Sequence, residues 1–358
     1  MKLLKQLLLL VVVVIGITLL YLIFFPVSIR PGTWNPPPAP KLIGQYQQNS
    51  KLASIERLPL GNGHGPEDVA LDSQGRIYAG LEDGRIIQLQ ADGTQPREFA
   101  DTKGRPLGLS FDPSGNLIIA DAVKGLLEVN KQGQVSILSQ QADGKEYGCL
   151  NDLDVAADGT IYFTEASNRF PMSQFTNDLL EHQPNGRLLV FDRRSHQAHT
   201  VLPELYFGNG VAISPDQSFL LVVETGLYRV RRVWLNGAKR GENDVFIDNL
   251  PGFPDGVSSN GKDKFWLSLV TPRDEMFDKI LPHPFVRKVV ARLPKFLQPA
   301  PKRYSFVLGL DAEGHVVENL QNGEPGCYAE IANAVERDGA LYFGSIGESS
   351  VGKYRLQR

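Results

Sequence analysis

The 358-residue sequence predicts an all-β protein, a six-bladed β-propeller preceded by a single N-terminal transmembrane helix. A strand–turn–strand pattern recurs six times over about 310 residues, and a unit of this size cannot bury both of its faces alone. No helical periodicity alternates with the strands, which disfavours a parallel α/β sheet. The third observation is a long uncharged segment near the N-terminus, well separated from the repeats.

The first 25 residues have the pattern of a signal-anchor helix. Lys2 and Lys5 precede a run of 19 uncharged residues from Leu7 to Phe25, which is long enough to cross a bilayer. No small-residue cleavage motif follows, so a retained anchor is favoured over a removed signal peptide or a buried core helix. The positive-inside rule keeps the lysines cytoplasmic and the rest of the chain extracytoplasmic. Because no N-x-S/T sequon follows, a bacterial periplasm is favoured over a eukaryotic lumen.

Residues 26–50 form a proline-rich linker that includes "PVSIRPGTWNPPPAP". This composition predicts a stiff, extended spacer rather than a folded element, so the propeller is expected over residues 51–358. The net charge of −3 gives no reason to expect a nucleic acid as partner. The two cysteines, Cys149 and Cys327, offer no disulfide framework and are expected to be reduced in the core.

Each repeat reads as a strand, a polar turn and a second strand of apolar or aromatic residues. The six hairpins are "VALDSQGRIYAG" (69–80), "LSFDPSGNLIIAD" (109–121), "LDVAADGTIYFTE" (153–165), "VAISPDQSFLLVVE" (211–224), "VSSNGKDKFWLSL" (257–269) and "NAVERDGALYFGS" (333–345). Most are followed by further strands, which brings a unit to four. The segment "SIERLPL" (54–60) precedes the first hairpin and is expected to close the ring by pairing with the last blade.

The turns supply landmarks that align the repeats: Gly75, Gly115, Gly159, Gln217, Asp263 and Gly339. Eight residues before these landmarks lie Glu67, Leu107, Asn151, Asn209, Asp255 and Ile331. Four of the six positions carry a side-chain oxygen where an innermost strand begins, at the mouth of the central channel. Two carboxylates and two amides that converge there suit Ca²⁺, and the lack of histidine or thiol ligands argues against zinc. The alternative is that Asn and Asp recur there because they favour turns.

Two residues close to these positions are further candidates for the site. Asp152 follows Asn151 and is expected either to support a metal ligand or to lie in a surface turn. His64 precedes Glu67 by three residues and is expected on the rim of the mouth or, as a lone loop histidine, without a role.

Several motifs resemble those of a known family. They are "GPEDVALD", "LNDLDVAADGTIYFTEAS", "FGNGVAISPD", "VVETGLYRVRRVWL" and "LPGFPDGV". Residues 50–356 resemble the strictosidine synthase-like branch of the calcium-dependent propellers, especially the adipocyte plasma membrane-associated protein group, which also has an N-terminal anchor. The chain is more distantly similar to paraoxonases and to the gluconolactonase/senescence marker family.

The resemblance implies an axial Ca²⁺ and hydrolysis of lactones or aryl esters. Carried over residue by residue, it gives Glu67, Asn151, Asn209 and Asp255 as metal ligands, the same four residues that the spacing selects. We expect Asp255 to activate water or to attack the carbonyl, and Glu67 to serve charge and geometry. Leu107 stands where paraoxonases have a histidine, so a histidine relay is not expected.

The sequence is also compatible with two other functions. The first is a non-catalytic scaffold in which Ca²⁺ only stabilises the propeller. The second is condensation of the strictosidine synthase type, which uses a glutamate on the last blade and no metal. That glutamate has no clear counterpart in "EIANAVERDG", and the set of four oxygen-bearing residues favours hydrolysis.

One segment, residues 274–303, interrupts the fifth repeat. From Phe285 its apolar residues share one helical face, opposite a face with Arg287, Lys288, Arg292 and Lys295. A basic amphipathic helix at 285–295 is expected either to lie on an anionic membrane surface or to cap the channel.

Overall fold

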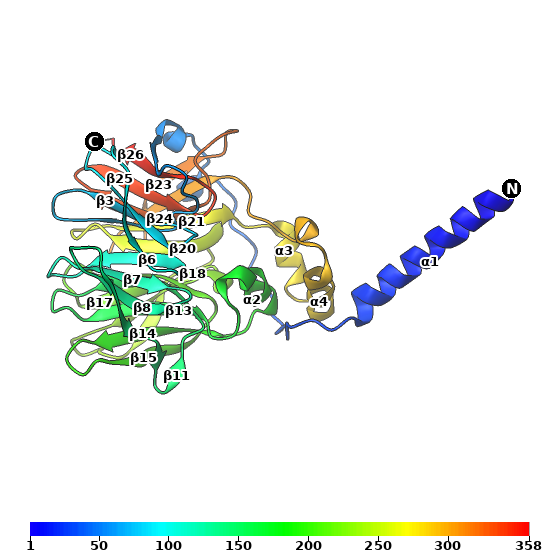
Figure 1. The fold of residues 1–358 in the computed structure, drawn as a ribbon, viewed down its shortest axis with the longest axis horizontal. Coiled ribbons are helices and arrows are strands. Elements are labelled where there is room, and N and C mark those ends of the chain that lie inside the picture. Colours follow the sequence, from blue (N-terminus) through cyan, green and yellow to red (C-terminus); the bar gives the residue numbers. More distant parts are fainter. Residues whose placement is uncertain (358) are drawn as a thin grey trace.

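The computed structural model describes residues 1–357, and it confirms the six-bladed β-propeller (Figure 1). Six four-stranded antiparallel sheets make up the blades. The innermost strands β2, β6, β12, β16, β20 and β24 contact one another in that order, and β24 returns to β2. The ring is therefore closed, and the channel lies along its axis.

The blades follow one another along the chain, each running from its innermost to its outermost strand. The first three are β2 (Val69–Leu71), β3 (Ile77–Gly80), β4 (Arg85–Leu89) and β5 (Arg97–Asp101); β6 (Pro106–Phe111), β7 (Leu117–Asp121), β8 (Gly125–Val129) and β9 (Val135–Ser139); β12 (Cys149–Val155), β13 (Ile161–Ser167), β14 (Gly186–Asp192) and β15 (Gln197–Leu205). A small hairpin, β10 (Gln141–Ala142) and β11 (Lys145–Glu146), lies between the second and third blades in sequence.

The remaining blades follow the same order until the ring closes. They are β16 (Gly208–Ile213), β17 (Phe219–Glu224), β18 (Arg229–Trp234) and β19 (Asn243–Ile247); β20 (Gly252–Ser259), β21 (Phe265–Pro272), β22 (Ser305–Leu310) and β23 (Val316–Asn322); β24 (Ile331–Arg337), β25 (Ala340–Ser345), β26 (Ser350–Arg355) and β1 (Glu56–Pro59).

Strand β1 completes the last blade, as the sequence predicted. It pairs antiparallel with β26 from Glu56 opposite Lys353 to Pro59 opposite Ser350. Leu58 is buried in this pairing beside Val351. The first and last strands of the domain are thus hydrogen-bonded to each other, which leaves no open gap in the ring.

The hairpin turns explain the regular spacing and one exception to it. Gly75 has a φ of +76° and donates its N–H to Asp72, and Gln217 takes the same left-handed conformation at +56°. The last blade turns more tightly, through Asp338 and Gly339 alone. Because this turn is shorter, a count of eight residues back from Gly339 reaches one residue too far.

Helix α1 (Lys2–Phe24) is long and apolar enough to cross a membrane, and none of its residues is buried against the protein. The proline-rich segment after it contains the 3-10 turns η1 (Gly44–Tyr46) and η2 (Lys51–Ser54). Residues 26–43 contain no helix or strand, but the segment is not a free spacer. Ile29 and Tyr46 are buried in the core, and Trp34 stacks on His182 with a centroid distance of 4.4 Å.

Two helical excursions cover the face of the propeller that looks toward α1 (Figure 1). The first, between β13 and β14, contains η3 (Met172–Gln174) and α2 (Phe175–Glu181). The second, between β21 and β22, contains α3 (Glu275–Ile280), α4 (Pro284–Arg292) and η5 (Lys295–Leu297). Since an innermost strand leaves the mouth and the second strand returns to it, both excursions emerge at the mouth.

The amphipathic pattern of the insertion needs one correction. Arg287, which was expected on a solvated basic face, is fully buried. Its guanidinium donates hydrogen bonds to the carbonyl oxygens of Leu180 (2.9 Å) and Gly32. A buried charge is tolerated where hydrogen bonds replace its hydration; the two terminal nitrogens of Arg287 have such partners, whereas its Nε has none among residues 1–357. One arginine thus joins α4, α2 and the linker.

Candidate functional site

The structure brings the four predicted oxygen-bearing residues together at the channel mouth. Glu67 lies two residues before the first innermost strand, β2, and Asn151, Asn209 and Asp255 lie within the N-terminal halves of β12, β16 and β20. All four are buried, and all four line one cavity of about 680 Å³. They reach it from four different blades. The same spacing from the turn therefore places these residues at equivalent positions around the axis.

The two aliphatic residues of the alignment, Leu107 and Ile331, lie in different surroundings. Leu107 occupies the equivalent place on the second blade and borders the same polar floor. Ile331 does not, because it is buried in an apolar cluster between blades. The short turn of the last blade shifts the alignment by one, so that Ala332 is the equivalent residue and Asn333 follows it.

Glu67 has a cationic partner that the sequence reasoning missed. Arg105 Nη2 lies 3.2 Å from Glu67 Oε2, and Arg105 Nη1 donates to the Gly65 carbonyl at 3.0 Å. Burial raises the pKa of Glu67, and the Arg105 charge opposes that rise. Arg105 lies two residues before Leu107, on one of the two blades whose ring position has no side-chain oxygen. A ring position without an oxygen was the one feature of the sequence that could have pointed to Arg105.

Asp255 is in a different electrostatic position. Burial raises the pKa of its carboxyl well above the usual range, and the nearby charge of Glu67 raises it further. Only a hydrogen bond from Asn209 opposes the rise. Two carboxylates held close together in an apolar surrounding repel each other unless a proton or a cation intervenes.

The amides complete a donor set that fits a hard cation. Asn209 Nδ2 is held 3.2 Å from Thr225 Oγ1, while the buried Asn151 Nδ2 finds no hydrogen-bond partner among residues 1–357. An amide that is buried without a partner is unfavourable in an otherwise satisfied core. Oxygens from two carboxylates and two amides are ligands that Ca²⁺ accepts. The residues present therefore fit a calcium ion, with two negative charges from the protein to balance it.

A second layer of residues, one position further along each inner strand, holds the blades together. Asp68 accepts the Leu109 N–H at 2.8 Å and the Asn333 amide at 2.6 Å. Asp152 accepts the Val211 N–H at 2.9 Å. Asp152 is thus a buried link between the third and fourth blades and not a surface turn.

The second-layer position of the other three blades is glycine. These glycines are Gly108, Gly210 and Gly256. A Cβ on Gly108 would lie 2.6 Å from the Asp152 backbone, and one on Gly256 would lie 2.7 Å from the Asn333 side chain. At these two interfaces a polar residue on one blade lies against a glycine on the neighbouring blade. Burial raises the pKa of Asp68 to about 7, against the effect of its hydrogen bonds.

The cavity above this floor has mainly apolar walls. They are formed by Met172, Phe175 and Leu179 from the first excursion, Phe253, Val270 and Phe277 near the second, and Pro299–Lys302 before β22. Such a pocket, apolar with a few convergent polar groups, is the usual form of a small-molecule site. Figure 1 shows α2, α3 and α4 grouped on the face of the propeller that looks toward α1.

The remaining candidates lie outside the floor. His64 is exposed and does not line the cavity. Cys149 and Cys327 are free and buried, as expected, and burial raises the pKa of the Cys149 thiol. A surface group of Asp311, Glu313 and His315 also has metal-ligand spacing, but it is largely exposed, as acidic groups without an ion often are.

A closed six-bladed propeller with a polar axial site defines the class of protein, and comparisons with known proteins narrow it. The strictosidine synthase family model matches residues 151–238, and the model for the N-terminal part of strictosidine synthase-like proteins matches residues 44–89. The adipocyte plasma membrane-associated protein of Bos taurus is 34% identical over 94% of this chain and 86% of its own length. Strictosidine synthase-like protein 10 of Arabidopsis thaliana is 36% identical over 85% and 88%. The chain therefore belongs to the strictosidine synthase-like family that includes the adipocyte plasma membrane-associated proteins.

Solved structures with the same fold are more distant in sequence. A gluconolactonase from Xanthomonas campestris covers 86% of this chain and 92% of its own, with a TM-score of 0.62 and 18% identity. The calcium-binding protein regucalcin from Agrobacterium tumefaciens covers 83% and 91%, with a TM-score of 0.58 and 14% identity. At these identities the likeness shows the fold alone.

Proposed function

We propose that this protein is a membrane-anchored, calcium-dependent hydrolase of lactones or aryl esters. The observation that carries the proposal is the floor of the cavity, where Glu67, Asn151, Asn209 and Asp255 meet beneath apolar walls. The calcium-binding regucalcin and the gluconolactonase, which share the fold, support a metal and a small ester-like substrate.

When bound at the four oxygens, Ca²⁺ supplies Lewis-acid polarisation of the substrate carbonyl. The protein supplies the rest. The apolar walls exclude water and hold the acyl portion, while Asn151 and Asn209 orient the polar end through their amides. The two carboxylates have different surroundings, and we assign them different roles.

Asp255 is the residue that accepts the proton from water or attacks the carbonyl. Glu67 forms an ion pair with Arg105 at 3.2 Å, whereas Asp255 forms no ion pair with a basic side chain among residues 1–357. A carboxylate without a cationic side-chain partner is the stronger base of the two. Glu67 with Arg105 then sets charge and geometry. Single-turnover hydrolysis in ¹⁸O-labelled water separates the two roles of Asp255, because only a nucleophile places its own oxygen in the product.

The N-terminal anchor supports a proposal for the side of the membrane on which the propeller lies. Helix α1 carries Lys2 and Lys5 at its start, which places that end in the cytoplasm by the positive-inside rule and the propeller on the periplasmic or extracytoplasmic side. Cysteine accessibility to a membrane-impermeant reagent at the exposed Asp158, after Asp158→Cys, tests this orientation in intact cells.

The test of the activity uses the full-length chain in lipid nanodiscs with a panel of lactones and aryl acetates. We expect hydrolysis that chelation abolishes and Ca²⁺ restores, and a loss of about 10²-fold or more in kcat for Asp255→Asn. Asp311→Asn, in the exposed surface cluster, is the matched control and should retain full activity. Bound calcium without hydrolysis would favour a scaffold, and metal-independent reaction of an amine with an aldehyde would favour the strictosidine synthase type.

A further inference from the structure

We propose that α4 and η5 form a lipid-contacting surface that holds the mouth of the cavity against the bilayer, so that an apolar substrate enters from the membrane. The first part concerns where the protein sits. The second part rests on the proposed hydrolase function and deepens it, because it assigns the substrate to the bilayer-soluble lactones and esters.

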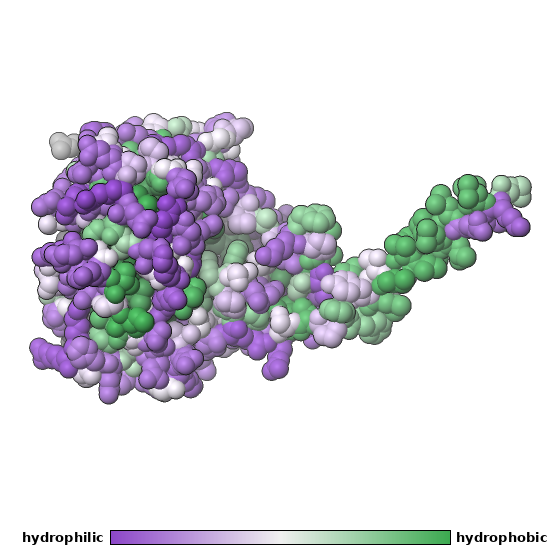
Figure 2. All heavy atoms as spheres, viewed as in Figure 1, coloured by the Kyte–Doolittle hydropathy of each residue, from purple (hydrophilic) through white to green (hydrophobic). Residues whose placement is uncertain are grey.

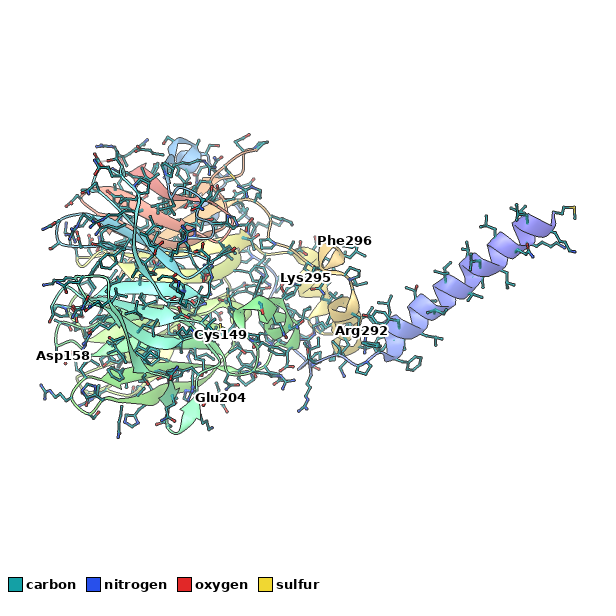
Figure 3. The ribbon with its side chains drawn as sticks, in the orientation of Figure 1. Cys149, Asp158, Glu204, Arg292, Lys295 and Phe296 are labelled. Atoms are coloured by element: carbon teal, nitrogen blue, oxygen red, sulfur yellow. The ribbon has the colours of Figure 1, made fainter. Side chains whose placement is uncertain are left out.

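The insertion leaves large apolar side chains without partners. Phe296 is 84% exposed, and Phe285 and Leu297 are 58% and 57% exposed. Lys295 stands beside them, and Figure 3 shows Lys295 and Phe296 at the outer edge of the insertion. Exposed aromatic and aliphatic groups next to lysine are the composition of an interfacial membrane-binding segment.

The buried side of the insertion explains why the exposed side is free. Arg287 and the partly buried Val290 face the protein, where Arg287 is hydrogen-bonded to α2 and the linker. The helix therefore caps the propeller with one face and presents its other face outward. The two expectations from the sequence, a cap and a membrane-facing helix, describe opposite sides of the same segment.

The membrane helix ends directly against this surface. Arg292 of α4 donates hydrogen bonds to the carbonyl oxygens of Phe25 (2.6 Å) and Leu22 (3.0 Å), at the C-terminal end of α1. Figure 2 shows hydrophobic residues on the insertion beside the base of the hydrophobic α1. A bilayer that surrounds α1 thus begins where the exposed residues lie, which makes lipid the occupant favoured over a second protein.

The linker fixes this arrangement. Gly32 donates its N–H to the Glu181 carbonyl at 3.0 Å, and Arg273 Nη2 donates to the Pro37 carbonyl at 2.7 Å. With Trp34 stacked on His182, the segment is a strap along the propeller. A free linker of this length would let the domain rotate, but a bound strap keeps the same face toward the membrane.

The same segment reaches the cavity. Phe296 and Leu297 are exposed, and Pro299 and Pro301, two and four residues after Leu297, line the cavity wall. Phe277 of α3 lines it as well. An apolar path therefore leads from the outward face of the insertion to the polar floor, without a crossing of bulk water.

The depth of Phe296 tests the first part without any activity. Full-length Phe296→Cys is spin-labelled in nanodiscs of phosphatidylcholine and phosphatidylglycerol, since the native Cys149 and Cys327 are buried. We expect the label to collide more with oxygen than with a water-soluble nickel chelate. The matched control is Asp158→Cys, on the part of the propeller far from α1 (Figure 3), which should behave as water-exposed. Equal nickel access at both sites, or protection from both reagents by a second protein copy, would overturn the proposal.

The route of entry is tested with a Phe296→Asp/Leu297→Asp double variant. We expect KM for membrane-partitioned δ-dodecalactone to rise about fivefold or more, while KM for water-soluble phenyl acetate changes less than about twofold. Equal effects on both substrates would overturn the entry from the bilayer. If the wild type hydrolyses neither substrate, the proposed function is refuted. The depth measurement would still decide whether the insertion contacts the membrane.

Discussion

Replacement of Asp255 by asparagine should have opposite effects with and without calcium. In the absence of metal, the buried carboxyl of Asp255 lies near Glu67, and its pKa is raised. A carboxyl whose pKa is higher in the folded state binds more protons folded than unfolded, so it reduces stability above its unfolded pKa. Asp255→Asn removes this penalty. At pH 8 in chelator, the variant should therefore unfold at the same temperature as the wild type or at a higher one.

With calcium the order should reverse. At a concentration about 100 times its Kd, a ligand adds about 2.7 kcal/mol of stability, which corresponds to a rise in Tm of about 5 °C for a large domain. Loss of one carboxylate ligand weakens binding by at least about 100-fold, as even outer partners of metal ligands contribute 10- to 100-fold. The variant then gains only about 0.4 kcal/mol at the same concentration, or about 1 °C.

The assay is thermal unfolding of the full-length chain in detergent, followed by fluorescence with and without Ca²⁺. Asp311→Asn, from the exposed cluster of Asp311, Glu313 and His315, is the control and should keep the full calcium response. The reasoning would be refuted if Asp311→Asn lost the response and Asp255→Asn retained it, or if Asp255→Asn destabilised the metal-free protein.

Three further predictions concern other parts of the structure. Arg105→Met should make the calcium affinity depend more strongly on pH, because the pKa of Glu67 rises further once the arginine charge that lowers it is gone; isothermal titration at several pH values measures this, and an unchanged pH dependence would contradict it. Burial lowers the pKa of His182 from 6.5 to about 4, so only the unfolded chain takes up a proton between these values. Stability should fall by about 3 kcal/mol as the pH drops from about 6.5 to about 4, and denaturant titrations should show less of this loss in His182→Gln. Leu58→Ala, in the strand that closes the ring, should cost about 2–5 kcal/mol in denaturant unfolding, whereas Glu56→Ala on the exposed side should cost under about 0.5; similar losses for both would argue against closure by β1.

Much of the fold was predictable because a propeller repeats its local pattern. The first four blades place a turn residue with left-handed backbone, such as Gly75 or Gln217, eight residues after the ring position. That regularity gave the blade number, the closure by β1 and four of the residues on the cavity floor. It failed at Ile331, where a shorter turn through Asp338 and Gly339 shifted the count by one residue.

The missed features arise from contacts between segments that are distant in sequence. Arg105 meets Glu67 across two blades, and Asp68 reaches Asn333 across the closure of the ring. Arg287 looked like a solvated residue on a basic helix, but its carbonyl partners come from α2 and the linker. Periodicity within one element carries no information on such partners, since they are set by how the blades and the strap pack.

The central claim is that four blades jointly hold one calcium ion at the channel mouth. A crystal structure of the protein grown with Ca²⁺ tests this most directly, through the position of the ion in anomalous difference density. We predict a single axial ion with oxygens of Glu67, Asn151, Asn209 and Asp255 at about 2.3–2.6 Å. An axial site without an ion at saturating calcium, or an ion bound only at Asp311 on the surface, would contradict the account.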